Sequence, residues 1–188
     1  CTCTKKGSTC STAALAAKQL GVPLKVVAKG IDYFKVVENP KFGYGSAMNP
    51  CIDCRIYILK LAREIMLEER ASFLISGEVV GQRPMSQKKD MLKCIEREAK
   101  VEDILVRPLS AKVLPPTLPE REGWIDREKL FSITGRGRKT QIDMAEKAGI
   151  DYPCPAGGCL LTDKNIARRL KDLFNHNKDY DLDDIKLL

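Results

Sequence analysis

The chain has 188 residues, of which 30% are charged and 44% are hydrophobic, and these proportions are typical of a globular protein. A chain of this length can bury a sizeable core without disulfides, and no apolar run approaches the roughly 18 residues that a membrane-spanning helix needs. We therefore expect neither a disulfide scaffold nor a membrane protein. The lack of a signal-peptide pattern favours the cytoplasm.

The formal net charge is +7, and this excess of Lys and Arg suits a partner rich in phosphate, such as RNA or a nucleotide. A lysine-rich surface that serves only solubility is the alternative interpretation. The lone histidine, His176, is expected to be exposed at a helix end, so a Ser–His or Cys–His hydrolase is a poor fit.

Helices and strands alternate over the first part of the chain. In order, the patterns predict a helix at 13–20, a strand at 24–28, a long helix at 52–70, a strand at 72–76, a helix at 87–100 with Ser86 as its N-cap, and a strand at 104–107. This alternation predicts an α/β fold with a doubly wound parallel sheet. Ligands of such folds bind beyond the carboxyl ends of the strands, where Cys51 would begin the long helix.

The chain changes character after residue 113. A proline-rich connection at 114–119 precedes short helices predicted at 126–132, 139–148 and 163–175. We therefore expect an α/β domain at 1–113 and a helical C-terminal extension at 114–188 that packs back on it. A small second domain is the alternative.

Eight cysteines are many for an enzyme of this size, and their spacing predicts metal or redox chemistry. Cys51 and Cys54 form a Cys-x-x-Cys pair at the start of the long helix, where backbone N–H groups and the helix dipole stabilise negative charge. Cys154 and Cys159 bracket a Pro/Gly-rich run. Cys94 lies in an apolar stripe and is expected to be an inert core residue.

Three kinds of centre fit these thiols. Three cysteines could hold an iron–sulfur cluster with one open coordination position, four could close a tetrahedral zinc site, and two could act as a catalytic pair without metal. Residue types and spacing alone leave these alternatives open.

Two loops carry glycine beside arginine. Gly77, Gly81 and Arg83 follow a predicted buried strand, where glycines let a phosphate approach backbone N–H groups and an arginine can add a bidentate contact. A plain loop is the alternative. The second loop is a basic turn that could grip RNA phosphates or simply be solvated, and it contains Arg136, Arg138 and Lys139.

A third basic feature lies on the last long helix. Arg168, Arg169 and Lys171 form a cationic face there, which more often serves solubility than binding.

The residues 48–55, Met-Asn-Pro-Cys-Ile-Asp-Cys-Arg, resemble the Asn-Pro-Cys-x-x-Cys motif of the MnmA/TrmU-type tRNA thiouridylases, which are PP-loop ATP pyrophosphatases. The likeness continues through 72–87, 105–117, 135–153 and 155–163, with some similarity to the ThiI 4-thiouridine synthases. It covers most of the chain, from about residue 11 to about residue 175.

The resemblance implies an adenine nucleotide α-hydrolase-like fold and a tRNA sulfurtransferase. ATP with Mg²⁺ would adenylate a uridine carbonyl oxygen in tRNA, and sulfur from sulfide or a persulfide carrier would then displace AMP. In the cluster-free branch the two catalytic cysteines match Cys51 and Cys159. In cluster-dependent relatives the ligands of a 4Fe-4S cluster match Cys51, Cys54 and Cys159, and Cys154 is the other candidate for the third ligand.

One departure from the family stands out. The PP-loop signature Ser-Gly-Gly-x-Asp-Ser does not occur in this sequence. Residues 1–113 are therefore expected to form a partial PP-loop domain that lacks its first strand and its phosphate loop. Two rival functions follow: a non-enzymatic RNA-interaction module that binds zinc or a cluster, and a cluster protein that relays sulfur without ATP.

Overall fold

The computed structural model describes residues 9–151 and 159–188, and the chain divides into two compact units. Unit 1 combines Cys1–Pro50 with Lys139–Leu188, and unit 2 is Cys51–Arg138. This division differs from the expected boundary at residue 113. The C-terminal helices belong with the N-terminal segment because the two make direct bonds, such as the one from the Met48 N–H to the Leu161 carbonyl oxygen at 3.1 Å.

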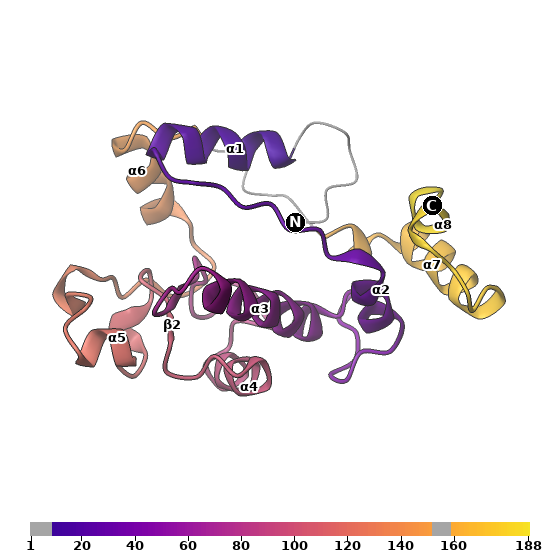
Figure 1. Cartoon of the computed structure of the whole chain (residues 1–188), viewed down its shortest axis with the longest axis horizontal. Coiled ribbons are helices and arrows are strands. Elements are labelled where there is room, and N and C mark those ends of the chain that lie inside the picture. The colour runs from indigo at the N-terminus through magenta and orange to yellow at the C-terminus, as the bar shows by residue number, and fades with distance from the viewer. Residues whose placement is uncertain (1–8, 152–158) are drawn as a thin grey trace. The chain divides into compact units, whose positions relative to one another are not determined.

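Two helices form the main packing layer of unit 2. Helix α3 (Cys51–Glu68) buries Ile52, Ile56, Leu59 and Met66, which are spaced along one side of the helix. It lies against α4 (Lys89–Ala99), as Figure 1 shows. Both helices were predicted from the sequence and are confirmed.

A short parallel sheet accompanies these helices. Strand β1 (Leu74–Ile75) pairs with β2 (Leu105–Val106) in the register Leu74–Leu105 and Ile75–Val106. Helix α4 lies between the two strands in the chain, so this part of unit 2 is a β-α-β crossover, as expected. Both predicted strands therefore exist, although each is shorter than predicted.

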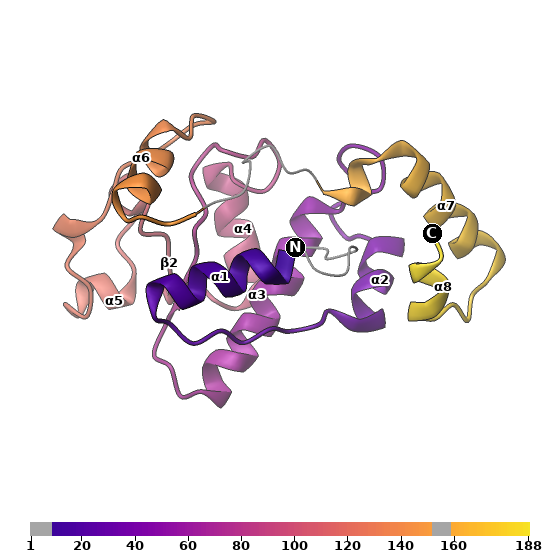
Figure 2. The ribbon, with the colours of Figure 1, turned by 90° about the horizontal axis from the view of Figure 1, so that it is seen from above.

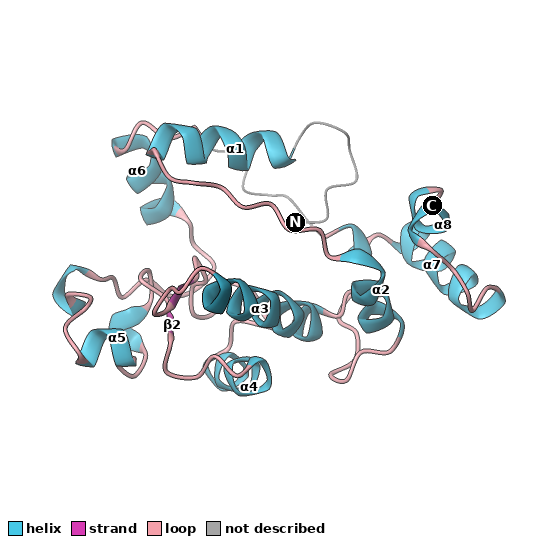
Figure 3. Cartoon of the chain, in the orientation of Figure 1, coloured by secondary structure: helices cyan, strands magenta, loops and turns pink. Residues whose placement is uncertain are grey.

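The doubly wound sheet needs more strands than the described residues supply, because these contain one two-stranded sheet. Figure 3 shows that helices and loops dominate the chain. The strand predicted at 24–28 is wrong. That segment has no regular secondary structure, and Leu24 and Val26 are 47% and 66% exposed. A β-branched run forms a strand only where a neighbour supplies backbone partners. The doubly wound architecture itself stays a prediction.

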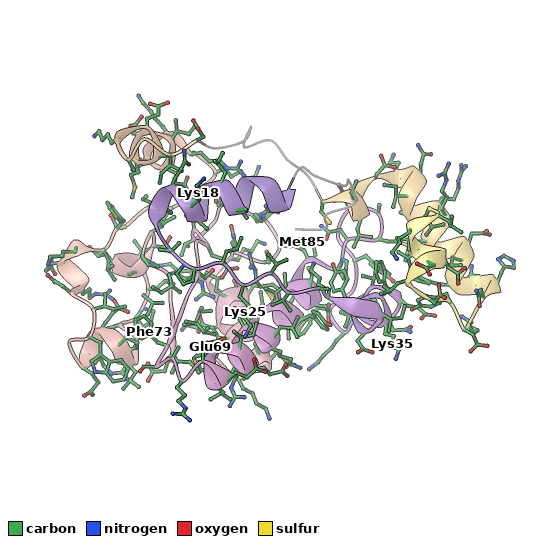
Figure 4. The ribbon with its side chains drawn as sticks, turned by 45° about the horizontal axis from the view of Figure 1, so that its top comes forward. Lys18, Lys25, Lys35, Glu69, Phe73 and Met85 are labelled. Atoms are coloured by element: carbon green, nitrogen blue, oxygen red, sulfur yellow. The ribbon has the colours of Figure 1, made fainter. Side chains whose placement is uncertain are left out.

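The rest of unit 2 consists of turns and short helices. Phe73, which directly precedes β1 and is labelled in Figure 4, packs on Trp124 with the ring centroids 6.3 Å apart. The predicted helix at 126–132 is reduced to one turn, because the Phe131 N–H bonds to the Pro108 carbonyl oxygen and leaves the helical path. The other elements here are η1 (Ala111–Val113), α5 (Leu118–Arg121) and η2 (Arg127–Lys129).

In unit 1, the segment that follows α7 (Lys164–His176) contacts the end of α2 (Gly30–Glu38). The Lys178 ammonium lies 3.4 Å from the Glu38 carboxylate, and the Tyr180 hydroxyl donates to the same carboxylate at 3.2 Å. Tyr180 also packs on Phe174 of α7. Figure 2 shows α7 beside α8 (Leu182–Lys186).

The predicted start of α7 is confirmed, because the Asp163 side chain accepts bonds from the N–H groups of Asn165 and Ile166. The 3-10 turn η3 (Leu160–Thr162) leads into this cap. Unit 1 also contains α1 (Thr9–Leu20) and α6 (Lys139–Lys147), which agree with predicted helices. Helix α2 and helix α8 were not predicted.

Every helix in the described part of the chain is too short or too polar to cross a membrane.

A buried ion cluster links four elements of unit 2. The Arg107 guanidinium follows β2 and lies 3.0 Å from the Glu78 carboxylate, which follows β1, and both side chains are 2% exposed. Arg55 of α3 lies 2.8 Å from the other oxygen of Glu78, and Glu96 of α4 pairs with Arg107. The attraction between the two carboxylates and the two guanidiniums therefore offsets the free-energy cost of removing these charges from water.

Replacing Arg107 with methionine should lower the free energy of unfolding by about 3–5 kcal/mol, because the Glu78 carboxylate would stay buried with less of its charge compensated. Urea denaturation measures this. The matched control is Arg121→Met, which removes an exposed guanidinium paired with Asp103 and should change stability little. Equal losses in the two variants would contradict a structural role for the buried cluster.

Candidate functional site

The start of α3 presents two thiols. Cys51 is the first residue of the helix and Cys54 lies one turn later, and both are half-buried and not in disulfides. Pro50 is fully buried before Cys51, and Asp53 is buried in the first turn. A proline at the start costs no intrahelical hydrogen bond, and an acidic residue there complements the helix dipole. These features fix where the helix begins and so where the two sulfurs lie.

The Cys51 thiol donates to the Ser86 hydroxyl oxygen, with 3.3 Å between the sulfur and the oxygen. Ser86 is 2% exposed. Its predicted role as the N-cap of α4 is wrong, because the capping position is Lys88 and the chain makes further turns before the helix starts. Ser86 instead connects the loop after β1 to the helix start. Sequence reasoning missed this contact, because nothing in the local pattern pairs Ser86 with a residue 35 positions away.

The loop after β1 folds tightly on itself. The Gly81 N–H donates to the Gln87 carbonyl oxygen at 2.7 Å, so it is not free for a phosphate in this conformation. Gly81 has a φ of +77°, and a Cβ at this position would lie 3.5 Å from the Gly135 nitrogen. Gly77 is exposed and has no heavy atom within 4 Å of a Cβ position. Of the two predicted phosphate-binding glycines, only Gly77 keeps open space around it.

The basic turn lies directly against this loop. Val80 forms a parallel bridge with Thr134, and the Gly135 N–H donates to the Val80 carbonyl oxygen at 2.8 Å. The turn begins here, so Arg136 follows immediately after the contact. The predicted cofactor loop and the predicted RNA-binding turn are therefore neighbours within unit 2.

The arginines of these two segments differ in their surroundings. Arg83 and Arg136 are exposed, and neither has an ion-pair partner among the described residues. Arg138 is half-buried and does interact with other groups. Lys139 is the first residue of α6 and belongs to unit 1. The anion-binding capacity of unit 2 at this position therefore rests on Arg83 and Arg136.

We name the combination of Cys51, Cys54, Ser86, Gly81 and Gly135 the helix-start site. Three contacts join its parts: the Cys51–Ser86 hydrogen bond and the two backbone bonds made by Gly81 and Gly135. The site places two half-buried thiols in the same unit as a loop and a turn whose exposed arginines have no ion-pair partner among the described residues. Exposed arginines of this kind can bind a polyanion.

The other predicted ligands belong to unit 1 or fall outside the described residues. Cys159 belongs to unit 1, is half-buried, and precedes η3, where its carbonyl oxygen accepts from the Thr162 hydroxyl at 2.6 Å. Cys154 falls in 152–158, outside the described residues. In neither unit do three His, Cys, Asp or Glu side chains of the described residues gather as metal ligands. Cys51 and Cys54 supply two thiols for such a centre, and the third ligand stays a prediction.

Two further predictions concern single residues. Cys94 is half-buried on α4, consistent with the packing role expected for it. His176 is exposed at the end of α7, as predicted, with its ring nitrogen 3.3 Å from the Asp172 carboxylate.

Buried polar atoms near the site were not foreseen. The Gln87 side-chain oxygen and one terminal nitrogen of Arg107 are buried without a hydrogen-bond partner among the described residues. Neither residue was assigned a functional role from the sequence, because the burial of each side chain depends on how the loop after β1 and the residue after β2 pack.

Comparison with known proteins gives no independent identification. The chain matches no family model, no curated protein and no solved structure.

Substituting alanine for Gly81 should destabilise the protein by about 1–2 kcal/mol, because an L-residue is strained at the positive φ of this position. The Gly77→Ala variant is the control, since it enters open space, and it should leave the melting temperature unchanged. If the two variants melt alike, the left-handed backbone conformation of Gly81 is not a constraint on the stability of the loop.

Proposed function

We propose that this chain is the core of an ATP-dependent tRNA sulfurtransferase of the PP-loop type, acting in the cytoplasm. The observation that carries the proposal is the helix-start site, where the Cys51 thiol, the loop with Arg83 and the basic turn with Arg136 belong to one connected structure. The resemblance of residues 48–55 to the thiouridylase motif supplies the reaction class.

The chemistry explains why such a site needs both sulfur and cations. A uracil carbonyl oxygen is a poor leaving group until ATP adenylates it, a step that releases pyrophosphate. Sulfur then attacks the same carbon, the C–O bond breaks, and AMP leaves with the oxygen. Cations near the reacting carbon bind the phosphates of the substrates and stabilise the negative charge that develops.

Each proposed residue has a defined role. Cys51 carries or positions the incoming sulfur, and Cys159 is the second catalytic thiol. In the loop after β1, the exposed Arg83 would bind a phosphate of ATP. The Gly81 N–H could bind a phosphate only after its hydrogen bond to the Gln87 carbonyl oxygen had broken. Arg136, Arg138 and Lys139 would bind the tRNA backbone, and ATP would enter with Mg²⁺.

The donor set suits a 4Fe-4S cluster in one respect: Cys51 and Cys54 present two thiols one turn apart on a helix. Cys159 would be the third ligand. When bound, such a cluster with an open iron position supplies a place to hold sulfide away from water. The protein residues then position the uridine and exclude solvent.

A non-enzymatic RNA-interaction module with structural zinc or a structural cluster is the second candidate. It is favoured by the use of the Gly81 N–H within its own loop, where the Gln87 carbonyl oxygen accepts its hydrogen bond. Metal content separates the centres: about four irons per chain after anaerobic purification favour the cluster, and one zinc with all four thiols protected favours the module.

Replacing Cys51 with alanine should reduce tRNA thiolation by at least about 100-fold, because the sulfur nucleophile or its ligand is lost. The readout is thionucleoside formation from radiolabelled sulfide with ATP and unmodified tRNA. Filter retention of tRNA should stay at the wild-type level.

The control for this experiment is Cys94→Ala, which removes a half-buried thiol from α4 in the same unit. It should keep thiolation activity. Undiminished thiolation by the Cys51 variant would remove Cys51 from the mechanism, and thiolation without ATP would contradict the adenylation step.

A further inference from the structure

A pocket of about 710 Å³ opens in unit 1 between the end of α2, the loop that follows it and one face of α7. Its walls combine cations with apolar groups. The lining residues that matter here are Tyr44, Met48, Lys164, Arg168, Lys171 and Phe174. A pocket of this size can accommodate a nucleotide-sized ligand.

The cations of this pocket share one face of α7. Lys164, Arg168 and Lys171 are spaced by four and three residues, so they lie along the same side of the helix. All three are exposed, and none has an ion-pair partner among the described residues. Lys178 also lines the pocket, but its ammonium is held by Glu38 at 3.4 Å. Three positive charges therefore remain available to an anionic ligand.

Tyr44 provides a fixed aromatic surface in the same pocket. Its hydroxyl is close to two carbonyl oxygens, those of Val37 at 2.6 Å and Glu38 at 2.8 Å, and can donate to either. Burial of the hydroxyl, and then the charge of Glu38, raise the pKa of Tyr44 above its usual value, so the donor stays protonated. Tyr44 as a whole is nevertheless 40% exposed. Its position is thus held by the end of α2 while its surface stays accessible.

We propose that this groove binds single-stranded RNA, with a base stacked on Tyr44 and the flanking phosphates held by Arg168 and Lys171. An aromatic ring beside a row of cations is the arrangement that proteins use for unpaired nucleic acid. A base in a duplex is already stacked and cannot reach the ring, so the groove selects unpaired segments. The inference rests on the proposed function, since the natural ligand would be a single-stranded part of the tRNA substrate.

The test uses fluorescence anisotropy of the full chain with a labelled oligouridylate of about ten nucleotides, within the range that one such groove covers. The matched pair is Arg168→Ala and Arg169→Ala. Both remove one exposed arginine from α7, but Arg169 contacts the Leu188 carbonyl oxygen and does not line the pocket. Arg168→Ala should weaken binding and lower the slope of log K against log salt by about 0.7, and Arg169→Ala should change neither.

A second pair of variants tests the stacking. Tyr44→Leu should weaken binding about 5- to 100-fold, the loss expected when one base loses its aromatic partner, whereas Tyr44→Phe keeps the ring and should lose much less. Tyr44→Leu could lower the stability of the fold. The two arginine variants change only exposed side chains of α7, so the binding test can still be made with them.

Competitors define what the groove selects. Unlabelled single-stranded RNA should displace the probe, and duplex RNA, ATP and inorganic phosphate should do so far less. Equal effects of Arg168→Ala and Arg169→Ala, or displacement by ATP as effective as by the oligonucleotide, would overturn the proposal. The binding assay does not depend on sulfur transfer. If the protein binds RNA through Tyr44 but does not thiolate tRNA, the proposed function is refuted and the RNA-binding groove is not.

Discussion

The buried contact between Glu78 and Arg107 holds together the elements on which the helix-start site depends. Glu78 follows β1, Arg107 follows β2, Arg55 comes from the turn of α3 next to Cys54, and Glu96 comes from α4. A buried carboxylate is costly unless its partners stay in place, so each element is constrained by the other three. The loop after β1 therefore returns to the start of α3 with Ser86 at hydrogen-bonding distance from Cys51.

This arrangement separates stability from chemistry within unit 2. The charges that stabilise the fold are buried and paired, whereas the charges that could bind a substrate, on Arg83 and Arg136, are exposed and have no ion-pair partner among the described residues. Unit 1 likewise contains both paired and available charges. Glu38 neutralises Lys178, and three neighbouring cations of the same pocket remain available. Both units thus offer positive charge to a polyanion, in line with the net charge of +7.

Local patterns predicted the long helices well, because the apolar stripe of α3 and the Asp163 cap of α7 are properties of neighbouring residues. Features that depend on distant partners were missed or misplaced. The strand expected at 24–28 has the right residues but lacks strand partners, and Ser86 has the right chemistry for a cap but bonds to Cys51. The pocket beside α7 could not be foreseen, since only the folded chain shows that Arg168 and Lys171 line the same pocket as Tyr44. The sulfur motif was visible at once because Cys51 and Cys54 are close in sequence.

The central claim is that the thiols at the start of α3 work with a cysteine more than one hundred residues away. The most direct measurement is cross-linking of the native, anaerobically purified protein with a short bis-maleimide, followed by peptide mass spectrometry. The account predicts a cross-link from Cys51 or Cys54 to Cys159. If all three cysteines react with the reagent but Cys159 is never joined to the other two, the shared sulfur centre is contradicted.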